Sequence, residues 1–222
     1  VGGFLFILRA LMGLMLEPVN GNDPASPPIA KNKFSLSEWL TPFQDKLFVI
    51  YLVGMVLWGC SMNGFFGYIS IYINQLASNT FLVGIAVALP AITEMPSLLY
   101  GDRVLRKIGM LPTLMIGIAL LVIVSFIVSF TYDPVLLIVL NSIRGLGFGF
   151  WIVVGVRYVD SRAPEDKVAQ YQAINTLAIY IVPALFFSPI LGYIYDTLGV
   201  NSTFIVSGIM GVVTLLLLSW LH

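Results

Sequence analysis

The sequence predicts an all-α membrane protein whose main part is a bundle of six transmembrane helices. Of the 222 residues, 59% are hydrophobic and only 10% are charged, whereas a soluble domain has about 25% charged residues. Beyond residue 46, six stretches are apolar and about 20 residues long, the length that a helix needs to cross a hydrocarbon layer of roughly 30 Å. Lysine and arginine gather in alternate breaks between these stretches, as is typical of multi-pass membrane proteins.

Composition also excludes several function classes. The formal net charge is zero, with 11 basic and 11 acidic residues, and a nucleic-acid partner would need clustered excess basic residues. The single cysteine, Cys60, cannot form an internal disulfide. The sequence has no Ser–His pairing, phosphate loop or metal-ligand spacing, and its one histidine is His222. We therefore expect no enzyme, cofactor, metal ion or nucleic acid, and a lipid bilayer and a small solute as partners.

The first 46 residues are expected to precede the bundle. Val1–Leu16 is apolar but carries Arg9 and lacks a small-residue cleavage site, so it predicts the end of a preceding transmembrane helix rather than a signal peptide. We expect that helix to belong to a missing N-terminal six-helix half. Ser35–Glu38 has capping-box spacing, which predicts a short interfacial helix, with a plain loop as the alternative. The expected division is 1–16 as that helix end, 17–46 as a cytoplasmic loop between the halves, and 47–222 as the six-helix bundle.

The six expected spans are separated by short breaks, so neighbouring helices should run antiparallel. The spans are Leu47–Ile73, Phe81–Tyr100, Leu111–Phe130, Val135–Val156, Val168–Leu191 and Thr203–Leu221. The breaks are Asn74–Asn79, Gly101–Gly109, Thr131–Pro134, Asp160–Lys167 and Gly192–Ser202. Pro90, Pro96 and Pro183 are expected to interrupt their helices and to free backbone carbonyls that can line a cavity.

The distribution of positive charge predicts the orientation. One side of the bundle holds nine basic residues and the opposite breaks hold none, and cytoplasmic loops are the ones enriched in lysine and arginine. The nine are Lys31, Lys33, Lys46, Arg103, Arg106, Lys107, Arg157, Arg162 and Lys167. This side should therefore face the cytoplasm, with the chain ending inside the cell at His222, most simply in a plasma membrane.

An internal repeat divides the bundle into two three-helix units. Lys107–Thr113 matches Thr197–Thr203 at an offset of 90 residues, with Ile/Leu, Gly and Thr shared. Each copy leads into the third helix of a three-helix set, and the two copies should face opposite sides of the membrane. Inverted 3+3 repeats of this kind are typical of secondary transporters.

Two ionisable residues lie deep in the expected spans, Glu94 and Arg144. Such groups are costly in hydrocarbon unless paired or hydrated, so they are candidates for substrate or proton binding. The alternative is a fixed ion pair that holds helices together. Polar side chains at helical spacing extend the candidate set to Asn63, Asn141, Trp151 and Asn175, while Gln172 and Tyr180 share a face with the last of these. Such stripes form either a cavity wall or hydrogen bonds between helices.

The segment Gly101-Asp102-Arg103-Val104-Leu105-Arg106-Lys107-Ile108-Gly109 resembles the loop signature of the major facilitator superfamily. Gly155–Gln172 and Gly192–Gly199 resemble the corresponding segments of its lactose-permease-like branch. The resemblance implies that the chain is the C-terminal six-helix half of a twelve-helix secondary transporter. It also implies that Gly101, Asp102, Arg103, Arg106 and Lys107 form a loop that locks helix ends in one transport state.

The resemblance also implies roles for individual residues. Glu94 matches the eighth-helix glutamate that serves sugar binding and coupling in the permease, Arg144 stands at the tenth-helix histidine, and Asn63 at a seventh-helix aspartate. Two features depart from the family pattern: Gly147 replaces the proton-carrying glutamate, and Leu111–Phe130 contains no arginine. We therefore expect a proton-coupled symporter for a small polar organic solute, such as a sugar, nucleoside or organic acid, with Arg144 as a partner of Glu94. A non-transporting membrane sensor or scaffold is the alternative.

Overall fold

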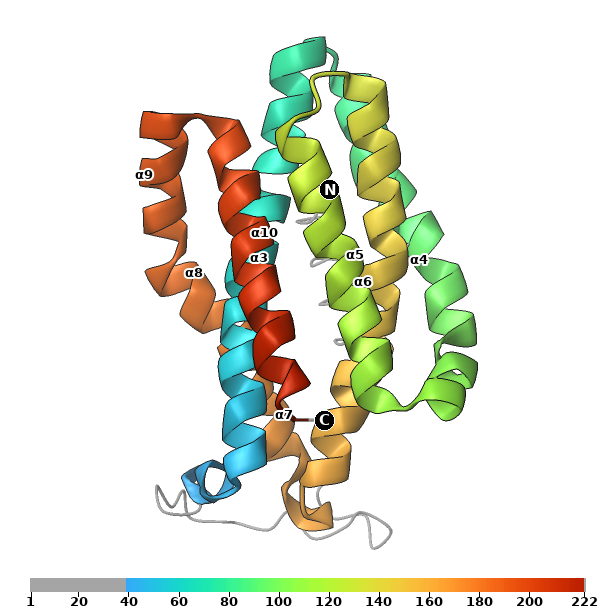
Figure 1. The fold of residues 1–222 in the computed structure, drawn as a ribbon, viewed down its shortest axis with the longest axis vertical. Helices are drawn as coiled ribbons and strands as arrows, with labels where there is room; N and C mark the ends of the chain where they lie inside the picture. Colours follow the sequence, from blue (N-terminus) through green and yellow to red (C-terminus); the bar gives the residue numbers. More distant parts are fainter. Residues whose placement is uncertain (1–38, 222) are drawn as a thin grey trace, which may run out of the picture. The chain divides into compact units, whose positions relative to one another are not determined.

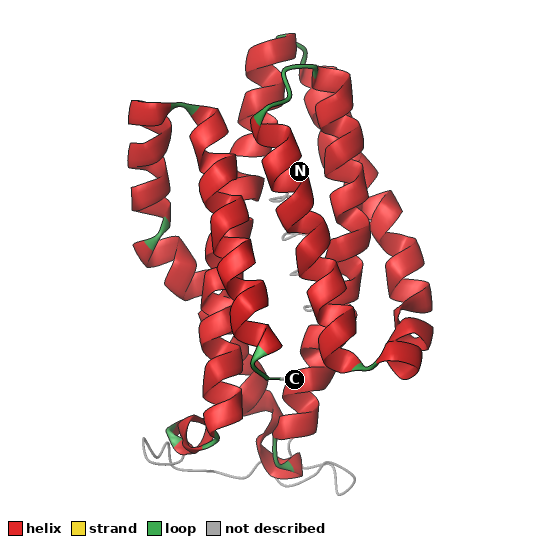
Figure 2. Ribbon diagram, in the orientation of Figure 1, coloured by secondary structure: helices red, strands yellow, loops and turns green. Residues whose placement is uncertain are grey.

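The computed structural model describes residues 39–221, which form helices joined by short turns (Figures 1 and 2). The helices are α3 (Lys46–Ala77), α4 (Thr80–Ile108), α5 (Met110–Ser129), α6 (Pro134–Arg162), α7 (Val168–Thr176), α8 (Val182–Phe186), α9 (Ser188–Leu198) and α10 (Val200–Ser219). A 3-10 turn at Thr41–Gln44 precedes them. The expected helix end at 1–16 and the capping sequence Ser35–Glu38 lie outside the described residues.

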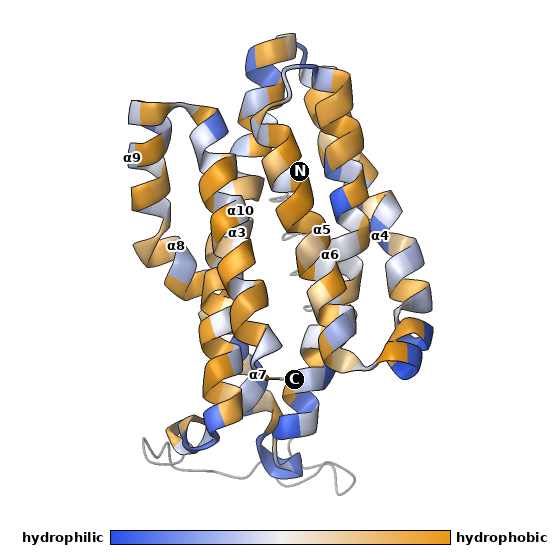
Figure 3. Cartoon of the chain, viewed as in Figure 1, coloured by the Kyte–Doolittle hydropathy of each residue, from blue (hydrophilic) through white to orange (hydrophobic). Residues whose placement is uncertain are grey.

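The helices have the length and composition of membrane spans. Five of them, α3, α4, α5, α6 and α10, are long and apolar enough to cross a bilayer. A sixth span follows if Glu165–Phe186 and Ser188–Leu198, which meet at a bend of 44°, are taken together. Figure 3 shows apolar residues along most of the helices and hydrophilic ones mainly near their ends. The prediction of an all-α membrane bundle is confirmed.

Two of the expected breaks are much shorter than predicted. α4 continues to Ile108 and α9 to Leu198, so most of Gly101–Gly109 and Gly192–Ser202 is helical. The prediction erred because charged and polar residues end an apolar span without ending a helix, and Arg, Lys and Leu are good helix formers. Pro90 and Pro96 also lie inside a continuous α4 rather than interrupting it.

α4 and α9 each end instead at a glycine with a positive φ. These two glycines occupy equivalent positions in the predicted repeat. Gly109 has φ 94° and ψ 168°, and Gly199 has φ 84° and ψ 170°. A positive φ is strained for residues that carry a Cβ. Each glycine is followed by a 20-residue helix, α5 or α10. The α4–α5 and α9–α10 turns lie at opposite ends of the bundle (Figure 1), as an inverted repeat requires.

The fifth span is broken where two prolines follow each other closely. A π-helical segment, Leu177–Ile181, joins α7 to α8, and Pro183 lies in the first turn of α8. The sharp bend occurs after it, at Phe187, before Pro189 in the first turn of α9. Proline has no N–H for the carbonyl four residues earlier and clashes with it, so the helix redirects there. The prediction placed the interruption at Pro183 and did not include Pro189.

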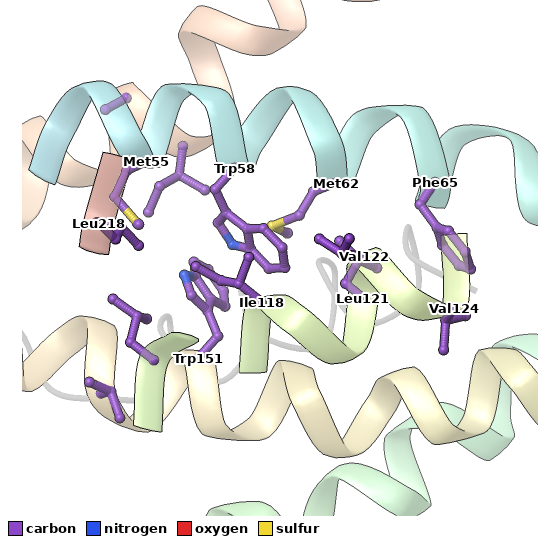
Figure 4. Close-up of a cluster of buried hydrophobic side chains, with 14 of the residues drawn as sticks. Met55, Trp58, Met62, Phe65, Ile118, Leu121, Val122, Val124, Trp151 and Leu218 are labelled. Atoms are coloured by element: carbon purple, nitrogen blue, oxygen red, sulfur yellow. The ribbon is translucent and has the colours of Figure 1, made fainter. Parts of the chain in front are cut away.

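Close helix packing depends on glycines at the contacts of α6. A Cβ on Gly145 would collide with the Pro90 carbonyl of α4, and one on Gly147 would lie 2.6 Å from the Gly117 carbonyl of α5. Small residues allow this approach, which supplies much of the packing energy between membrane helices. Between α3, α5 and α6 the core is aromatic and aliphatic: Trp58 and Trp151 face each other with ring centroids 5.9 Å apart (Figure 4).

Candidate functional site

Arg144 is a buried cation on α6 that a neighbouring asparagine holds in place. Its side chain is 5% exposed, and its Nε donates to Asn141 Oδ1 at 2.9 Å. Asn141 Nδ2 in turn donates to the Ala86 carbonyl of α4 at 2.7 Å. That carbonyl is available because residue 90, four positions later, is a proline without an N–H. The carbonyl that Pro90 leaves free in α4 and the guanidinium of α6 are therefore linked through one side chain.

Aromatic rings cover the Arg144 guanidinium. Its central carbon lies 4.0 Å from the ring centroid of Phe66, 5.6 Å from that of Phe65 and 5.8 Å from that of Phe148. Desolvated contacts of this kind stabilise a cation by about 2 kcal/mol. The Nη1 atom is buried and has no hydrogen-bond partner among residues 39–221. Both N–H donors of Nη1 are thus unused among the described residues.

Glu94 lies on α4 and packs against Gly149 of α6. Its side chain is partly exposed, and a Cβ on Gly149 would lie 3.2 Å from Glu94 Cγ and 2.9 Å from its backbone oxygen. Gly149 therefore makes room for this carboxylate-bearing turn of α4. Thr93, the residue before it, donates to the Ser142 carbonyl of α6 at 2.6 Å, which fixes the two helices side by side.

The expected partnership of Glu94 with Arg144 is electrostatic rather than a direct ion pair. The two charges interact through space. The described part of the chain, however, forms ion pairs only between Asp102 and Arg157 and between Asp45 and Arg162. Asn141 and the phenylalanine rings occupy the guanidinium instead. Glu94 is consequently free of a short salt bridge in this conformation.

Two adjoining cavities lie beside these charges, and both are lined by Ile179 and Tyr180. The first, of ≈ 250 Å³, is lined by Met62, Asn63, Phe66, Phe148, Ile179 and Tyr180. The second, of ≈ 270 Å³, is lined by Trp151, Ile152, Gly155, Val156, Gln172, Asn175, Thr176, Ile179 and Tyr180. The structure therefore brings the candidates Asn63, Trp151 and Asn175 to one concave surface. Glu94, Arg144 and Asn141 line neither cavity.

The charged segment at the C-terminal end of α4 forms an interhelical ion pair. Asp102 Oδ2 accepts from Arg157 of α6 at 2.6 Å, and both side chains are close to half exposed. Gly101 packs against Val153, where a Cβ would lie 3.3 Å from the valine side chain. Arg103 lies over the Tyr100 ring. Arg106 and Lys107 occupy the last turn of α4, where positive charge is favourable to the helix dipole.

Comparison with protein-family models identifies the family of the chain. The model of the MFS_1 like family matches residues 7–206. The chain belongs to this family. No curated protein matches it. The MFS_1 like match confirms the superfamily resemblance, and the lactose-permease-like branch stays a prediction.

Membership in the MFS_1 like family makes the chain an integral, multi-pass membrane protein of a transporter family rather than an enzyme family. Two features of the site were not predicted from the sequence. One is Tyr51, whose buried hydroxyl lies near Gly155. The other is the phenylalanine cage of Arg144, formed by the rings of Phe65, Phe66 and Phe148. The cage residues Phe65 and Phe66 follow Asn63 on the same helix, but only the packing of α3 on α6 brings them to the arginine. No spacing rule within one helix reveals such a contact.

Proposed function

We propose that this MFS_1 like family member is a proton-coupled symporter for a small polar organic solute, working by alternating access. The observation that carries the proposal is Glu94, a carboxyl in an apolar span that has no ion pair among residues 39–221 although Arg144 lies close enough to interact with it. Ionisable groups at such depth are rare and serve transport pathways. A carboxyl without a fixed salt bridge can take up and release a proton as its surroundings change.

In this proposal the joined cavities hold the solute. Asn63, Trp151 and Asn175 supply polar contacts on their walls. Asn141 keeps Arg144 oriented, and protonation of Glu94 removes its electrostatic attraction to Arg144. The bundle rocks against an N-terminal six-helix half, as in other transporters built from repeats. A sugar, a nucleoside and an organic acid are the solute classes to be tested.

The Asp102–Arg157 pair serves as the conformational lock. It joins the ends of α4 and α6 on the side that also carries Arg106, Lys107 and Arg162. Because cytoplasmic loops are enriched in lysine and arginine, we propose that this side faces the cytoplasm and that the membrane is a plasma membrane. Basic side chains there also gain about 1 kcal/mol each from anionic lipid.

The test is uptake by the full-length protein in proteoliposomes. Radiolabelled glucose, uridine and lactate are supplied with and without an imposed pH gradient. We expect the gradient to accelerate uptake of one of them. Glu94→Gln should abolish this acceleration but should not change the rate of solute exchange measured without a gradient. Glu165→Gln, the same chemical change in an exposed turn outside the spans, is the matched control.

Two results contradict the proposal. Gradient-driven uptake that survives Glu94→Gln removes the coupling role from this residue. Uptake that ignores the pH gradient in the unmodified protein removes proton coupling altogether. If none of the three solutes is taken up, the non-transporting sensor or scaffold becomes the better account.

A further inference from the structure

An apolar groove lies between α3 and α7, on a face of these helices that the two cavities do not use. It has a volume of ≈ 490 Å³ and shares no lining residue with either cavity. Its walls include Val49, Val53 and Val56 of α3 and Ile174 of α7. A buried water molecule needs two to four polar partners, and these side chains offer none. The walls therefore favour an apolar occupant.

The two helices that form the groove touch at its inner end. A Cβ on Gly59 of α3 would collide with the Ile179 carbonyl, and it would lie 2.6 Å from the Pro183 ring. Gly59 is three residues beyond Val56, so this contact lies just past the apolar walls. The groove therefore extends from the Gly59–Ile179 contact toward the basic end of the bundle.

Two lysines lie at the basic end of the groove, one on each side of it. Lys46 precedes Val49 and Val53 by three and seven residues, and Lys167 precedes Ile174 by seven. Residues at these spacings share one face of a helix. Neither lysine forms an ion pair among residues 39–221. Both positive charges are therefore available to an occupant of the groove.

The two lysines also lie at the same depth. Lys46 is 13 residues before Gly59 and Lys167 is 12 before Ile179, which places both roughly 18–20 Å from the contact of the helices. Figure 3 shows hydrophilic residues gathered at this end of α3 and α7. Trp39 lines the groove here, and tryptophan is typical of the boundary between lipid and water. The lysines therefore lie at the level of lipid head groups.

The neighbouring acids do not occupy the mouth of the groove. Asp45 pairs with Arg162, whose Nη1 lies 3.5 Å from the Asp45 carboxylate. Glu165 and Asp166 precede Lys167 in an exposed turn, further from the apolar walls. The unpaired charges closest to the walls are consequently positive, which favours an anionic group at this point.

These features select an occupant that is apolar at one end and anionic at the other. A helix, about 10 Å wide, can cover a groove of this kind but cannot enter it, whereas an acyl chain is a single file of methylene groups. Lipid tails are as apolar as aliphatic side chains, so the tail gains little by leaving the bilayer. The head group must therefore provide the selectivity.

We propose that the groove is a binding site for one anionic phospholipid, with an acyl chain between α3 and α7 and the phosphate between Lys46 and Lys167. Basic pockets between membrane helices bind anionic head groups in this way. The site requires a bilayer but neither a transported solute nor proton coupling, so it stands apart from the proposed function.

The test counts lipids bound to the full-length protein by native mass spectrometry. The detergent-solubilised protein is titrated with dioleoyl phosphatidylglycerol or with dioleoyl phosphatidylcholine, which has the same tails and no net charge. Lys46→Gln and Lys167→Gln each remove one charge from the mouth. Lys107→Gln is the matched control, because Lys107 lies in the last turn of α4 and does not line the groove.

We expect one phosphatidylglycerol molecule to bind more tightly than phosphatidylcholine. A basic residue beside anionic lipid contributes a factor of about five, so each groove variant should weaken phosphatidylglycerol binding about fivefold and leave phosphatidylcholine binding unchanged. Lys107→Gln should change neither, and Lys46→Arg should retain binding.

A second pair of variants tests the groove itself. Val53→Trp fills it without altering any charge, since Val53 lines the groove and is 49% exposed, and it should abolish the tight binding. Val87→Trp, at an exposed valine of α4 outside the groove, should leave binding intact.

Three results would overturn the lipid site. Equal effects of Lys46→Gln and Lys107→Gln would reduce the lysines to general attraction of the basic surface. Equal effects of Val53→Trp and Val87→Trp would place the lipid elsewhere. Absence of a tightly bound phosphatidylglycerol from the unmodified protein would indicate that another part of the protein covers the groove. None of these results bears on pH-driven uptake, so the lipid site and the proposed symport can fail separately.

Discussion

The link from Pro90 through Asn141 to Arg144 makes a quantitative prediction. Asn141 Nδ2 donates to the Ala86 carbonyl at 2.7 Å, and Asn141 Oδ1 accepts from Arg144 Nε at 2.9 Å. Asn141→Leu keeps the branching of the side chain but leaves both groups buried and unpaired. A side-chain hydrogen bond in a membrane protein contributes about 0.6 kcal/mol on average and up to about 1.7 kcal/mol, so the bond from α6 to α4 and the bond to the charged Arg144 within α6 together amount to about 2 kcal/mol.

Pro90→Ala should reduce that cost. An alanine at position 90 restores an N–H that can reach the Ala86 carbonyl within α4, so this acceptor no longer depends on Asn141. In the Pro90→Ala background, Asn141→Leu then forfeits only the bond to Arg144, about 1 kcal/mol. The expected coupling energy between the two positions is therefore about 1 kcal/mol.

The assay is reversible unfolding in mixed micelles with increasing dodecyl sulfate, followed by tryptophan fluorescence, on the four proteins of the double-mutant cycle. Pro96→Ala replaces Pro90→Ala in a control cycle, because Pro96 lies in the same helix and frees a carbonyl that Asn141 does not contact. There Asn141→Leu should keep its full cost. An equal cost of Asn141→Leu in the Pro90→Ala and unmodified proteins would refute the reasoning.

Two further predictions follow from the packing and the ion pairs. Gly149→Ala should lower the free energy of unfolding by about 1–3 kcal/mol, because the added methyl group would lie 2.7 Å from an atom of α4. Gly67→Ala is the control and should be neutral or stabilising, because nothing lies within 4 Å of the added methyl group. Both are measured by unfolding in micelles, and equal effects of the two substitutions would contradict the prediction. Asp102→Asn, which removes the charge facing Arg157, should leave abundance nearly normal but shift cysteine accessibility between the two faces and slow transport. Asp196→Asn, at an acid without an ion pair in the described residues, is the control, and an unshifted pattern with normal transport would leave only membrane anchoring.

The spans and the repeat could be predicted because they depend on properties that each segment carries alone. Twenty apolar residues must cross the bilayer as a helix, since no other backbone conformation satisfies its own hydrogen bonds in lipid. The glycines of the repeat, Gly109 and Gly199, are likewise local: each adopts a positive φ that other residues rarely take. Polarity alone was a poor guide to helix ends, which is why α4 and α9 exceed their predicted lengths.

The details of the site depend on contacts between helices and therefore escaped prediction. Arg144 is covered by rings from α3, and Gly155 lies near the hydroxyl of Tyr51, which is 104 residues away in sequence. The sequence identified Glu94 and Arg144 as ionisable groups within apolar stretches, and the structure places them inside α4 and α6. Their separation was decided by Asn141, whose side chain is drawn to a carbonyl that a proline on another helix leaves open.

The packing of α4 on α6 also determines where the charges of Glu94 and Arg144 lie. Gly145 receives the Pro90 turn of α4, and Gly149, one turn later, receives the Glu94 turn. The approach that these two glycines allow also brings the Ala86 carbonyl within reach of Asn141, which orients Arg144. A side chain at either glycine would push α4 away and disturb both charges together. Any movement of α4 against α6 must consequently change the surroundings of Glu94 and Arg144 at the same time, which gives a conformational change a direct route to both ionisable groups.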